Sequence, residues 1–527
     1  MLLTELVATS QNVAATSSRL AKRAALVDLL RKLQTPDDVQ IAAAYLAGEL
    51  RQRRTGVGWA TVSTAPPSAP DPSLTLGEVD AELDRIAKLS GPGSALARAQ
   101  AVTGLLARAT ADEQAFLRRL LLGDVRQGAL DSAMLDAVAA ASSISLAVIR
   151  RAVMLRGATG PVAVAALTEG RAAVESFGLT VGQPVRPMLA SSAPDVAAAF
   201  TKLGQDIEAV IDTKLDGIRI QVHKSRADVR VFTRSLDDIT ARLPEVVALV
   251  RTLPAEELIL DGEAIALDAG GRPRPFQETA SRTARRLEGE LGPAAADVTP
   301  FFFDCLYVDG EELLDLALRD RLRRLDSLVP ASFVAPRLVT ADAAEGSAFF
   351  DDAVAAGQEG VVVKATGATY DAGRRGAAWI KVKPRHTLDL VVLAVEWGSG
   401  RRAGTLSNIH LGARNARDGS FVMLGKTFKG MTDEMLSWQT QRFLELETSR
   451  TGQVVHLRPE QVVEVAFDGL QRSSRYPGGF ALRFARVLRY RDDKSVDETD
   501  TIDTVQALAA SSSPGRSPGS PTRGPLG

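Results

Sequence analysis

The sequence predicts a multidomain protein with an all-α N-terminal domain, an α+β central domain and a C-terminal domain that forms a small β-barrel. Three observations support this fold class. The chain has 527 residues, whereas a single domain usually has about 100 to 200. Apolar residues have a helical spacing up to about residue 180. Beyond residue 184 short alternations of apolar residues, which are typical of strands, replace that spacing.

The N-terminal part reads as a set of helices joined by short loops. Between residues 20 and 33 apolar side chains recur at spacings of three and four, which predicts an amphipathic helix. Thr110 and Glu113 have the spacing of a capping box at a helix start. The segment Gly91-Pro-Gly-Ser94 predicts a turn between helices, and the prolines of 66–72 predict a loop.

The rest of the chain reads as two further domains and a tail. In the central part we expect a helix at 320–328 and strands at 218–222, 258–266, 301–307, 361–363 and 380–382. After Pro384 we expect a helix at 432–447 and strands at 388–396, 421–428, 454–457, 462–467 and 484–490. Five strands and a helix in about 115 residues suit a barrel such as the OB-fold. The predicted domains are therefore 1–183, 184–384 and 385–508, and the Ser/Pro/Gly-rich residues 509–527 are expected to be a disordered tail.

Composition excludes several classes of protein. The apolar fraction of 45% and the charged fraction of 24% are those of a globular protein. One cysteine, Cys305, excludes an intrachain disulfide and a four-cysteine zinc site. No apolar run is long enough to span a membrane and no secretory signal is visible, so we expect a cytoplasmic protein. The net charge of −1 shows no general excess of basic residues, but it does not describe how charge is distributed.

Lysine is scarce, because only 12 of the 63 basic residues are lysines. Where the chain needs a positive charge it nearly always uses arginine. A lysine is therefore a candidate for chemistry that arginine cannot perform, such as presenting an amine that loses its proton and attacks an electrophile. Codon bias remains an alternative explanation for any single lysine.

The segment Ile211-Asp-Thr-Lys214-Leu-Asp216-Gly217-Ile-Arg219 is the strongest candidate for a catalytic lysine. It places Lys214 at the end of a strand, just before an Asp-Gly turn, with Arg219 on the next strand. A nearby guanidinium and burial both lower the pKa of a lysine, which favours the nucleophilic free amine. A hairpin with solvated charges is the alternative.

Three other segments present candidate functional side chains on apolar strands. In Leu260-Asp-Gly-Glu263 the strand alternation puts both carboxylates on one face, which suggests a metal or a sugar hydroxyl, or else a solvated edge strand. Phe301–Phe303 offers a ring that could stack on a base, although core packing explains most such segments. In Trp379–Lys383 alternation directs Ile380 and Val382 inward and both lysines to one face. Such a pair favours a polyphosphate between the lysines, or a salt-bridged surface strand.

Taken together and in order, these segments resemble the motifs of the covalent nucleotidyltransferases, which comprise DNA ligases, RNA ligases and mRNA capping enzymes. The matching segments are Lys214-x-Asp216-Gly217-x-Arg219, Thr233-Arg234-Ser235, Asp261-Gly262-Glu263, Phe303-Asp304, Glu359-Gly-Val-Val-Val-Lys364, Lys381-x-Lys383 and Arg491-x-Asp493-Lys494. In addition, Gly123–Ala129 resembles the helical DNA-binding domain of archaeal, eukaryotic and one actinobacterial type of ATP-dependent DNA ligase. The abundant Ala and Arg suit that actinobacterial type.

The resemblance implies a role for each matched residue. Lys214 would take AMP from ATP and release pyrophosphate. Asp212 would contact adenine, Phe303 would stack on it, and Arg219 and Glu263 would hold the ribose. A group of cations would bind the phosphates: Arg234, Arg375, Lys381 and Lys383. Glu263 and Glu359 would be the acidic partners of Mg²⁺ or Mn²⁺.

The resemblance also implies a moving barrel and a DNA substrate. Arg491 and Lys494 would swing over the site to orient the pyrophosphate, with a hinge at Lys383-Pro384-Arg385. The expected partners are ATP and nicked double-stranded DNA, gripped through its backbone, and the expected state is a monomer at the nucleoid in the cytoplasm.

Two alternatives and two departures accompany this hypothesis. An RNA ligase or capping enzyme would share the motifs but lack the helical domain, and a non-catalytic clamp would be expected to lose some of the lysines and carboxylates. Relatives more often have Glu at Asp212 and Pro at Ala485. These departures affect the expected rate and nucleotide affinity, because neither removes a group that the reaction requires.

Overall fold

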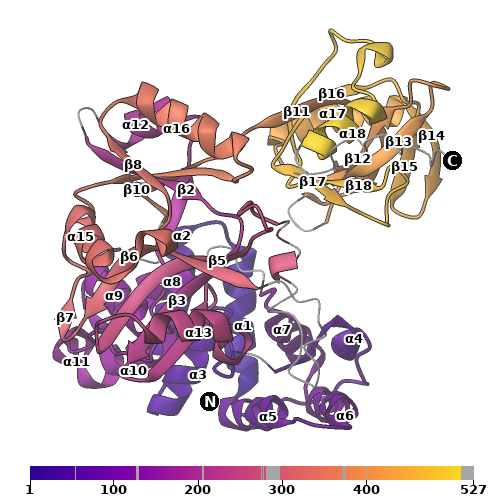
Figure 1. Cartoon of the computed structure of the whole chain (residues 1–527). Helices are drawn as coiled ribbons and strands as arrows, with labels where there is room; N and C mark the ends of the chain where they lie inside the picture. Colours follow the sequence, from indigo (N-terminus) through magenta and orange to yellow (C-terminus); the bar gives the residue numbers. More distant parts are fainter. Residues whose placement is uncertain are drawn as a thin grey trace, which may run out of the picture.

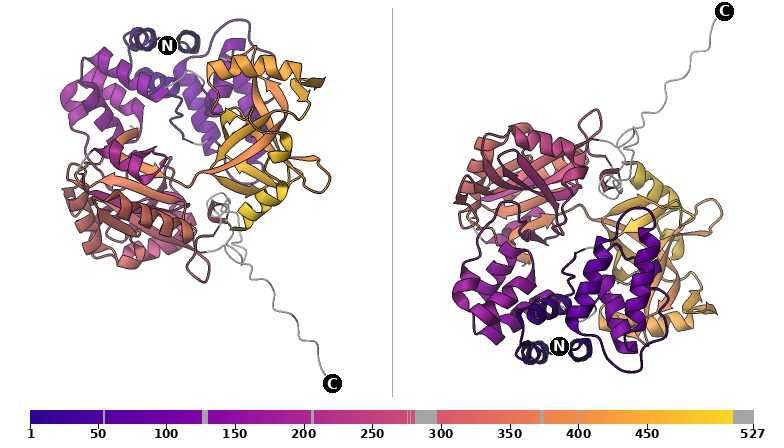
Figure 2. Two further views of the ribbon diagram at one scale, coloured as in Figure 1. Left: turned by 90° about the horizontal axis from the view of Figure 1, so that it is seen from above. Right: turned by 90° about the horizontal axis from the view of Figure 1, so that it is seen from below.

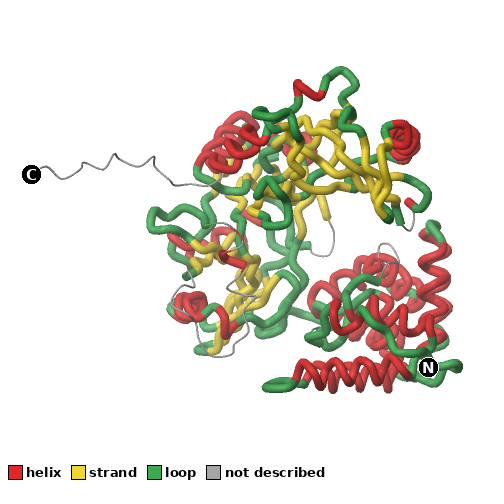
Figure 3. Tube along the Cα trace, turned by 90° about the vertical axis from the view of Figure 1, so that its right-hand side faces the viewer, coloured by secondary structure: helices red, strands yellow, loops and turns green. Residues whose placement is uncertain are grey.

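The computed structural model describes residues 1–53, 55–125, 130–204, 207–274, 276, 278–280, 297–371, 375–399 and 402–511. It has a helical N-terminal part, a central part with two sheets, and a β-rich C-terminal part (Figure 1). Figure 3 shows that helices dominate the N-terminal part, while strands gather in the other two parts. The predicted fold class is confirmed.

The N-terminal part is a helical domain around a core of Leu, Val and Ala side chains. The capping box is present, because the Thr110 side chain accepts from Glu113 N and Glu113 accepts from Thr110 N. Residues 126–129 of the segment Gly123–Ala129, which carried part of the family resemblance, lie outside the described residues. The helices are α1 (Leu3–Ala15), α2 (Arg19–Leu30), α3 (Pro36–Leu46), α4 (Trp59–Val62), α5 (Leu76–Lys88), α6 (Ser94–Ala107), α7 (Ala111–Leu121), α8 (Leu130–Ser142), α9 (Leu146–Arg156), α10 (Thr159–Val164), the π-helix η1 (Ala165–Glu169) and α11 (Arg171–Glu175).

The central part contains two five-stranded sheets. The first sheet has the order β1 (Leu189–Ser192), β10 (Arg375–Val382), β9 (Gly360–Ala365), β2 (Ala209–Lys214), β8 (Arg337–Thr340). The second has the order β4 (Asp228–Thr233), β3 (Ile218–Ser225), β5 (Glu257–Ala266), β6 (Val298–Val308), β7 (Glu311–Glu312). Apolar side chains of α12 (Val196–Leu203) and α16 (Ala343–Ala355) pack on the first sheet, and those of α13 (Pro244–Arg251) and α15 (Leu318–Leu328) pack on the second. Short 3-10 turns are η2 (Thr240–Arg242) and η3 (Ala331–Phe333).

The Asp216-Gly217 turn joins strands of different sheets, because β2 belongs to the first sheet and β3 to the second. The hairpin considered in the sequence analysis is therefore wrong. Gly217 makes the crossing possible, since a Cβ there would lie 2.3 Å from Ile265 Cγ2 and 2.4 Å from the Ala264 carbonyl oxygen. The crossing places Lys214, at the end of β2, beside both sheets.

The C-terminal part is an OB-like barrel whose central strand, β11 (His386–Trp397), pairs with β12, β15 and β16 along its length. Its other elements are β12 (Leu406–Arg414), β13 (Phe421–Thr427), α17 (Asp433–Glu445), β14 (Glu447–Thr451), β15 (Val454–Leu457), β16 (Val462–Phe467), β17 (Gly469–Arg472), β18 (Phe480–Arg483), β19 (Arg486–Tyr490), the 3-10 turn η5 (Val496–Glu498) and α18 (Ile502–Ser511).

Three expectations for this part need correction. The strand expected from 484 begins at Arg486, because Phe484 has a φ of 54°. The sequence analysis overlooked β12, β14, β17 and β18. Residues 509–511, expected to belong to a disordered tail, are instead the end of α18; the rest of the expected tail, residues 512–527, lies outside the described part of the chain.

The three parts form an open C. The barrel and helices α4–α7 extend from the same side of the central part, one above the other (Figures 1 and 2). Residues 383–385 alone connect the end of β10 to the start of β11. Arg186, between the helical and central parts, donates to Asp131 at 2.8 Å and to Glu49 at 2.6 Å, and so fixes the helical domain to the central one.

Candidate functional site

Lys214 lies in an ion-paired cluster between strands β2, β9 and β10. Its Nζ pairs with Glu359 Oε2, and Nζ of Lys383 pairs with the other oxygen of the same carboxylate. These side chains are 23%, 19% and 22% exposed, so a ligand could reach them. Gly360 has a φ of +134°, and a Cβ there would lie 2.2 Å from the Val382 carbonyl oxygen, so only glycine lets β9 begin this close to β10. One carboxylate thus separates two ammonium groups that would otherwise repel each other.

Two more carboxyl groups face this cluster. Glu263 lies on β5 of the second sheet, and Asp216 lies in the connection between β2 and β3. Burial raises the pKa of Glu263 to about 7, although the charges of Lys214 and Arg219 act to lower it. Burial also raises the pKa of Asp216, and the negative charge of Glu359 adds to that effect. Arg219 and Glu263 are direct neighbours across β3 and β5. The two sheets therefore bring a lysine, an arginine and several carboxyl groups to one place.

The raised pKa of Glu263 predicts how stability depends on pH. Its value of about 7 exceeds the ordinary 4.5, so the folded state holds this proton more tightly than the unfolded chain does. Stability should fall as pH rises through that interval, by roughly 3 kcal/mol. Glu263→Gln removes the ionisation. Without ATP or magnesium, its thermal unfolding midpoint should exceed that of the wild type clearly at pH 8 and much less at pH 5. An equal difference at both pH values would contradict this.

Arg219 is fixed by a buried network behind the cluster. Its Nε and Nη2 donate to the two oxygens of Asp261 at 3.0 and 2.5 Å, and its Nη1 donates to the Met188 carbonyl at 2.7 Å. The Tyr370 hydroxyl donates to Asp261 at 2.8 Å. A bidentate pair of this kind holds the guanidinium in one orientation. Asp261 therefore serves as the support of Arg219.

A pair of aromatic rings adjoins this network, because the Arg219 guanidinium lies 5.4 Å from the Phe303 centroid and 5.6 Å from that of Trp379. Phe303 and Trp379 meet edge to face with centroids 6.0 Å apart. Lys364 Nζ lies 4.6 Å from the Phe303 centroid and 4.1 Å from that of Trp379, and it forms an ion pair with Asp212. Burial raises the pKa of Asp212, against the charge of Lys364. Lys364, to which the sequence analysis gave no role, thus contacts both the Asp212 carboxylate and the two rings.

The other expected phosphate-binding residues, Lys381, Arg234 and Arg375, come from β10 and from the turn after β4. Lys381 is on β10, half-buried, two residues before Lys383, which directly follows the strand. Arg234 is exposed on the turn after β4 and lines a small cavity with Arg219 and Asp261. Arg375 begins β10, but its side chain is outside the described part of the structure.

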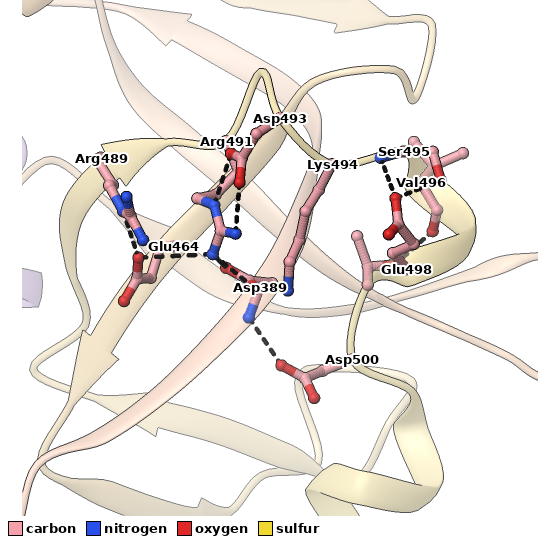
Figure 4. Close-up of polar contacts among 11 residues, drawn as sticks. Asp389, Glu464, Arg489, Arg491, Asp493, Lys494, Ser495, Val496, Glu498 and Asp500 are labelled. Atoms are coloured by element: carbon pink, nitrogen blue, oxygen red, sulfur yellow. Dashed lines mark hydrogen bonds and ion pairs between the residues drawn. The ribbon is translucent and has the colours of Figure 1, made fainter.

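Arg491 and Lys494 do not contact the Lys214 cluster. They lie on the barrel, where Arg491 Nη1 is 3.2 Å and Lys494 Nζ 2.6 Å from the same oxygen of Asp389 (Figure 4). Arg491 also donates to both oxygens of Asp493, at 2.8 and 2.7 Å, and lies 3.8 Å from Glu464. In this orientation of the barrel, carboxylates compensate both cations.

Other barrel residues contact the cluster instead. Asp468 Oδ2 is 3.2 Å from Lys383 Nζ, and Arg483 Nη1 is 3.6 Å from Asp216 Oδ2. The Asp468 amide donates to the Arg483 carbonyl at 3.0 Å, so these two residues are neighbours on the surface of the barrel. The sequence analysis gave neither residue a role, because no local pattern shows which face of the barrel meets the central part.

The carboxylates suit a hard cation. Among the described residues, no group of three or more His, Cys, Asp or Glu could hold a metal by itself. Magnesium is commonly bound by one or two carboxylates together with substrate phosphates, and oxygen ligands suit it. Glu263 and Glu359, which both interact with Lys214, fit that donor set.

None of the helices in the described part of the chain has the length and the apolar composition that a membrane span requires.

Family comparisons cover all three parts of the chain. Residues 187–383 match the family described as ATP dependent DNA ligase domain, 402–494 the ATP dependent DNA ligase C terminal region, and 61–139 the DNA ligase N terminus.

Individual relatives match along nearly the whole chain. A "Probable DNA ligase" of Beutenbergia cavernae is 66% identical over 97% of this chain and 100% of its own length. A "Probable DNA ligase" of Nocardioides sp. is 60% identical over 96% of this chain and 99% of its own length. The solved structure "Pmar-Lig_PreS3" shares the fold, with a TM-score of 0.59 and 20% identity over 92% of this chain and 99% of its own.

Proposed function

The chain belongs to the family of ATP-dependent DNA ligases, which seal nicks in DNA, and we propose that it does so through an AMP group carried on Lys214. One observation carries this assignment. The amine of Lys214 lies between the two sheets, against a carboxylate that also holds Lys383. A lysine in this setting has both a proton acceptor and a second cation for a phosphate beside it.

The first step is attack of the Lys214 amine on the α-phosphorus of ATP. The Lys214 N–P bond forms as the bond from the α-phosphorus to the bridging oxygen breaks, and pyrophosphate leaves. An ammonium group must lose a proton before it attacks, and Glu359, which contacts Nζ, is the proposed acceptor. Lys383 then remains beside the negative phosphate oxygens.

The proposed adenine site is the exposed side of Phe303. Phe303 would stack on the base, and Asp212 and Lys364 would contact its polar edge. Arg219 and Glu263, which are neighbours across β3 and β5, would hold the ribose. The proposed phosphate contacts are Arg234, Arg375, Lys381 and Lys383.

Glu263 and Glu359 would hold magnesium, or manganese, when it accompanies ATP. The cation would supply charge compensation on the phosphate oxygens, in the manner usual for phosphoryl transfer. The side chains of this chain carry out the remaining tasks: Lys214 attacks, Glu359 takes the proton, and Arg219 orients the sugar.

Arg491 and Lys494 would orient the pyrophosphate, and this requires the barrel to turn. In the orientation described, Asp468 and Arg483 face the site, while Arg491 and Lys494 are paired elsewhere on the barrel. Residues 383–385, which alone connect the two parts, are the proposed hinge.

The later steps take place on DNA. AMP passes from Lys214 to the 5′-phosphate at the nick, and the 3′-hydroxyl then attacks that phosphate, seals the strand and releases AMP. The open C formed by the helical domain, the central part and the barrel supports a clamp around a nicked duplex. Contacts to the DNA backbone suit an enzyme that accepts any sequence. We propose that it works as a monomer, in the cytoplasm at the nucleoid.

Mass spectrometry of the purified protein after incubation with ATP and magnesium tests the assignment. We expect one AMP per chain, on the peptide that contains Lys214, and discharge of that AMP when nicked duplex DNA is added. GTP should give no adduct. AMP on another lysine, or sealing of nicked RNA in preference to nicked DNA, would refute this proposal.

A further inference from the structure

Asp389 joins the two cations of the barrel that the proposed function assigns to the pyrophosphate. It lies at the start of β11, four residues beyond Arg385 of the proposed hinge. Arg491 and Lys494 follow β19, so the sequence separation is 102 and 105 residues. Both reach the same oxygen, Oδ2, at 3.2 and 2.6 Å (Figure 4).

The position of Asp389 is fixed by its backbone as well as by its strand. Its amide donates to Asp500 Oδ2 at 2.8 Å, and its carbonyl accepts from the Asp500 amide at 2.9 Å. Its side chain is 12% exposed, whereas that of Asp493, the other aspartate on Arg491, is 62% exposed. Salt screens the ion pairs of such a partly buried carboxylate much less than those of an exposed one.

Asp389 differs from the neighbouring carboxylates because it holds both cations. Asp493 and Glu464 contact Arg491, but among the described residues Asp389 is the one carboxylate within ion-pair distance of Lys494. The guanidinium of Arg491 and the ammonium of Lys494 lie 3.2 and 2.6 Å from the same oxygen. Two positive groups this close together repel each other unless an anion lies between them. Asp389 is thus what allows the guanidinium and the ammonium to converge.

All three residues belong to the barrel, so a rotation of the barrel about the hinge carries them together. The cations would reach the nucleotide already side by side, with part of their rotamer entropy already lost. Lys494 has three N–H donors and Arg491 five, so contacts with carboxylates are compatible with further contacts to a phosphate.

We propose that Asp389 is a positioning residue for self-adenylation: it holds Arg491 and Lys494 together so that they meet the pyrophosphate of ATP as a pair. This rests on the proposed role of Arg491 and Lys494. The pair has no such task once AMP is on the DNA, and therefore Asp389 should affect the first step of the reaction and not the last.

Two reactions of the full-length protein separate these steps. Formation of the Lys214–AMP adduct is followed in single turnovers with ATP and magnesium, and sealing is followed on a nick that already carries 5′-AMP, without ATP. Asp389→Asn keeps the shape but removes the charge. We expect it to slow adduct formation about 10-fold or more and to leave sealing of the adenylated nick within about twofold.

The reverse reaction gives a readout specific to pyrophosphate. Added pyrophosphate discharges AMP from Lys214, and Asp389→Asn should raise the pyrophosphate concentration for half-maximal discharge. Asp389→Glu, which keeps the charge, should recover most of the adduct-forming rate. Asp418→Asn is the matched control, because Asp418 is exposed on the same barrel and bonds to Ser420 within its own turn.

Equal slowing of both steps by Asp389→Asn would show a merely structural role and overturn the inference. An unchanged rate of adduct formation, or a slow Asp389→Glu, would also overturn it. Arg491→Ala and Lys494→Ala distinguish failure of the proposed function. If they leave adduct formation intact, the role of the cations is wrong. If they impair it while Asp389→Asn does not, this inference alone is wrong.

Discussion

Replacement of Lys214 by alanine should abolish the covalent adduct with AMP, and replacement by arginine should do the same. Alanine has no amine. Arginine keeps the charge beside Glu359, but its guanidinium does not lose a proton at any ordinary pH and cannot attack phosphorus. The measurement is retention of label on the denatured protein after incubation with ATP labelled at the α-phosphate.

The same variants should still seal a nick that already carries AMP, because Lys214 has completed its chemistry by then. Lys202→Ala provides the control: Lys202 is exposed on α12 and donates to the Ser192 carbonyl at 3.3 Å, away from the cluster. Label bound to Lys214→Ala would remove Lys214 from the mechanism.

Replacement of Glu359 by glutamine should slow adduct formation by about 10²- to 10³-fold. Glutamine has the size of glutamate but cannot accept the proton of Lys214, and it carries no charge to separate that ammonium from Lys383. The single-turnover rate of adduct formation measures the effect, at saturating ATP and magnesium.

Glu311→Gln is the matched control for this change, since Glu311 is exposed on β7 and pairs with Arg324 at 2.6 Å. Both variants should keep the thermal unfolding midpoint of the wild type within a few degrees, because these side chains are partly exposed. A rate for Glu359→Gln within twofold of the wild type would rule out Glu359 as proton acceptor.

Local sequence patterns predicted much of the fold and of the Lys214 cluster. Strand alternation correctly directed Ile380 and Val382 into the core, where both are fully buried. Strand alternation and helix-capping patterns depend only on residues that are neighbours along the chain. They therefore predict local structures such as a strand or the start of a helix. Strand β14 was overlooked because it lacks such a pattern. Its sequence Glu-Thr-Ser-Arg-Thr is polar and almost wholly exposed, so it shows no alternation of apolar residues.

The sequence by itself determined the fold class, the family resemblance and the candidate residues around Lys214, because residue type and short spacing suffice for these. Only the tertiary structure decided which groups meet. It separated β2 and β3 into different sheets, since an Asp-Gly turn looks the same in a hairpin and in a crossing. It also brought Asp468 to Lys383 and Asp389 to Arg491 and Lys494. Contacts between residues this far apart depend on how strands pair and domains orient, and no local pattern encodes that.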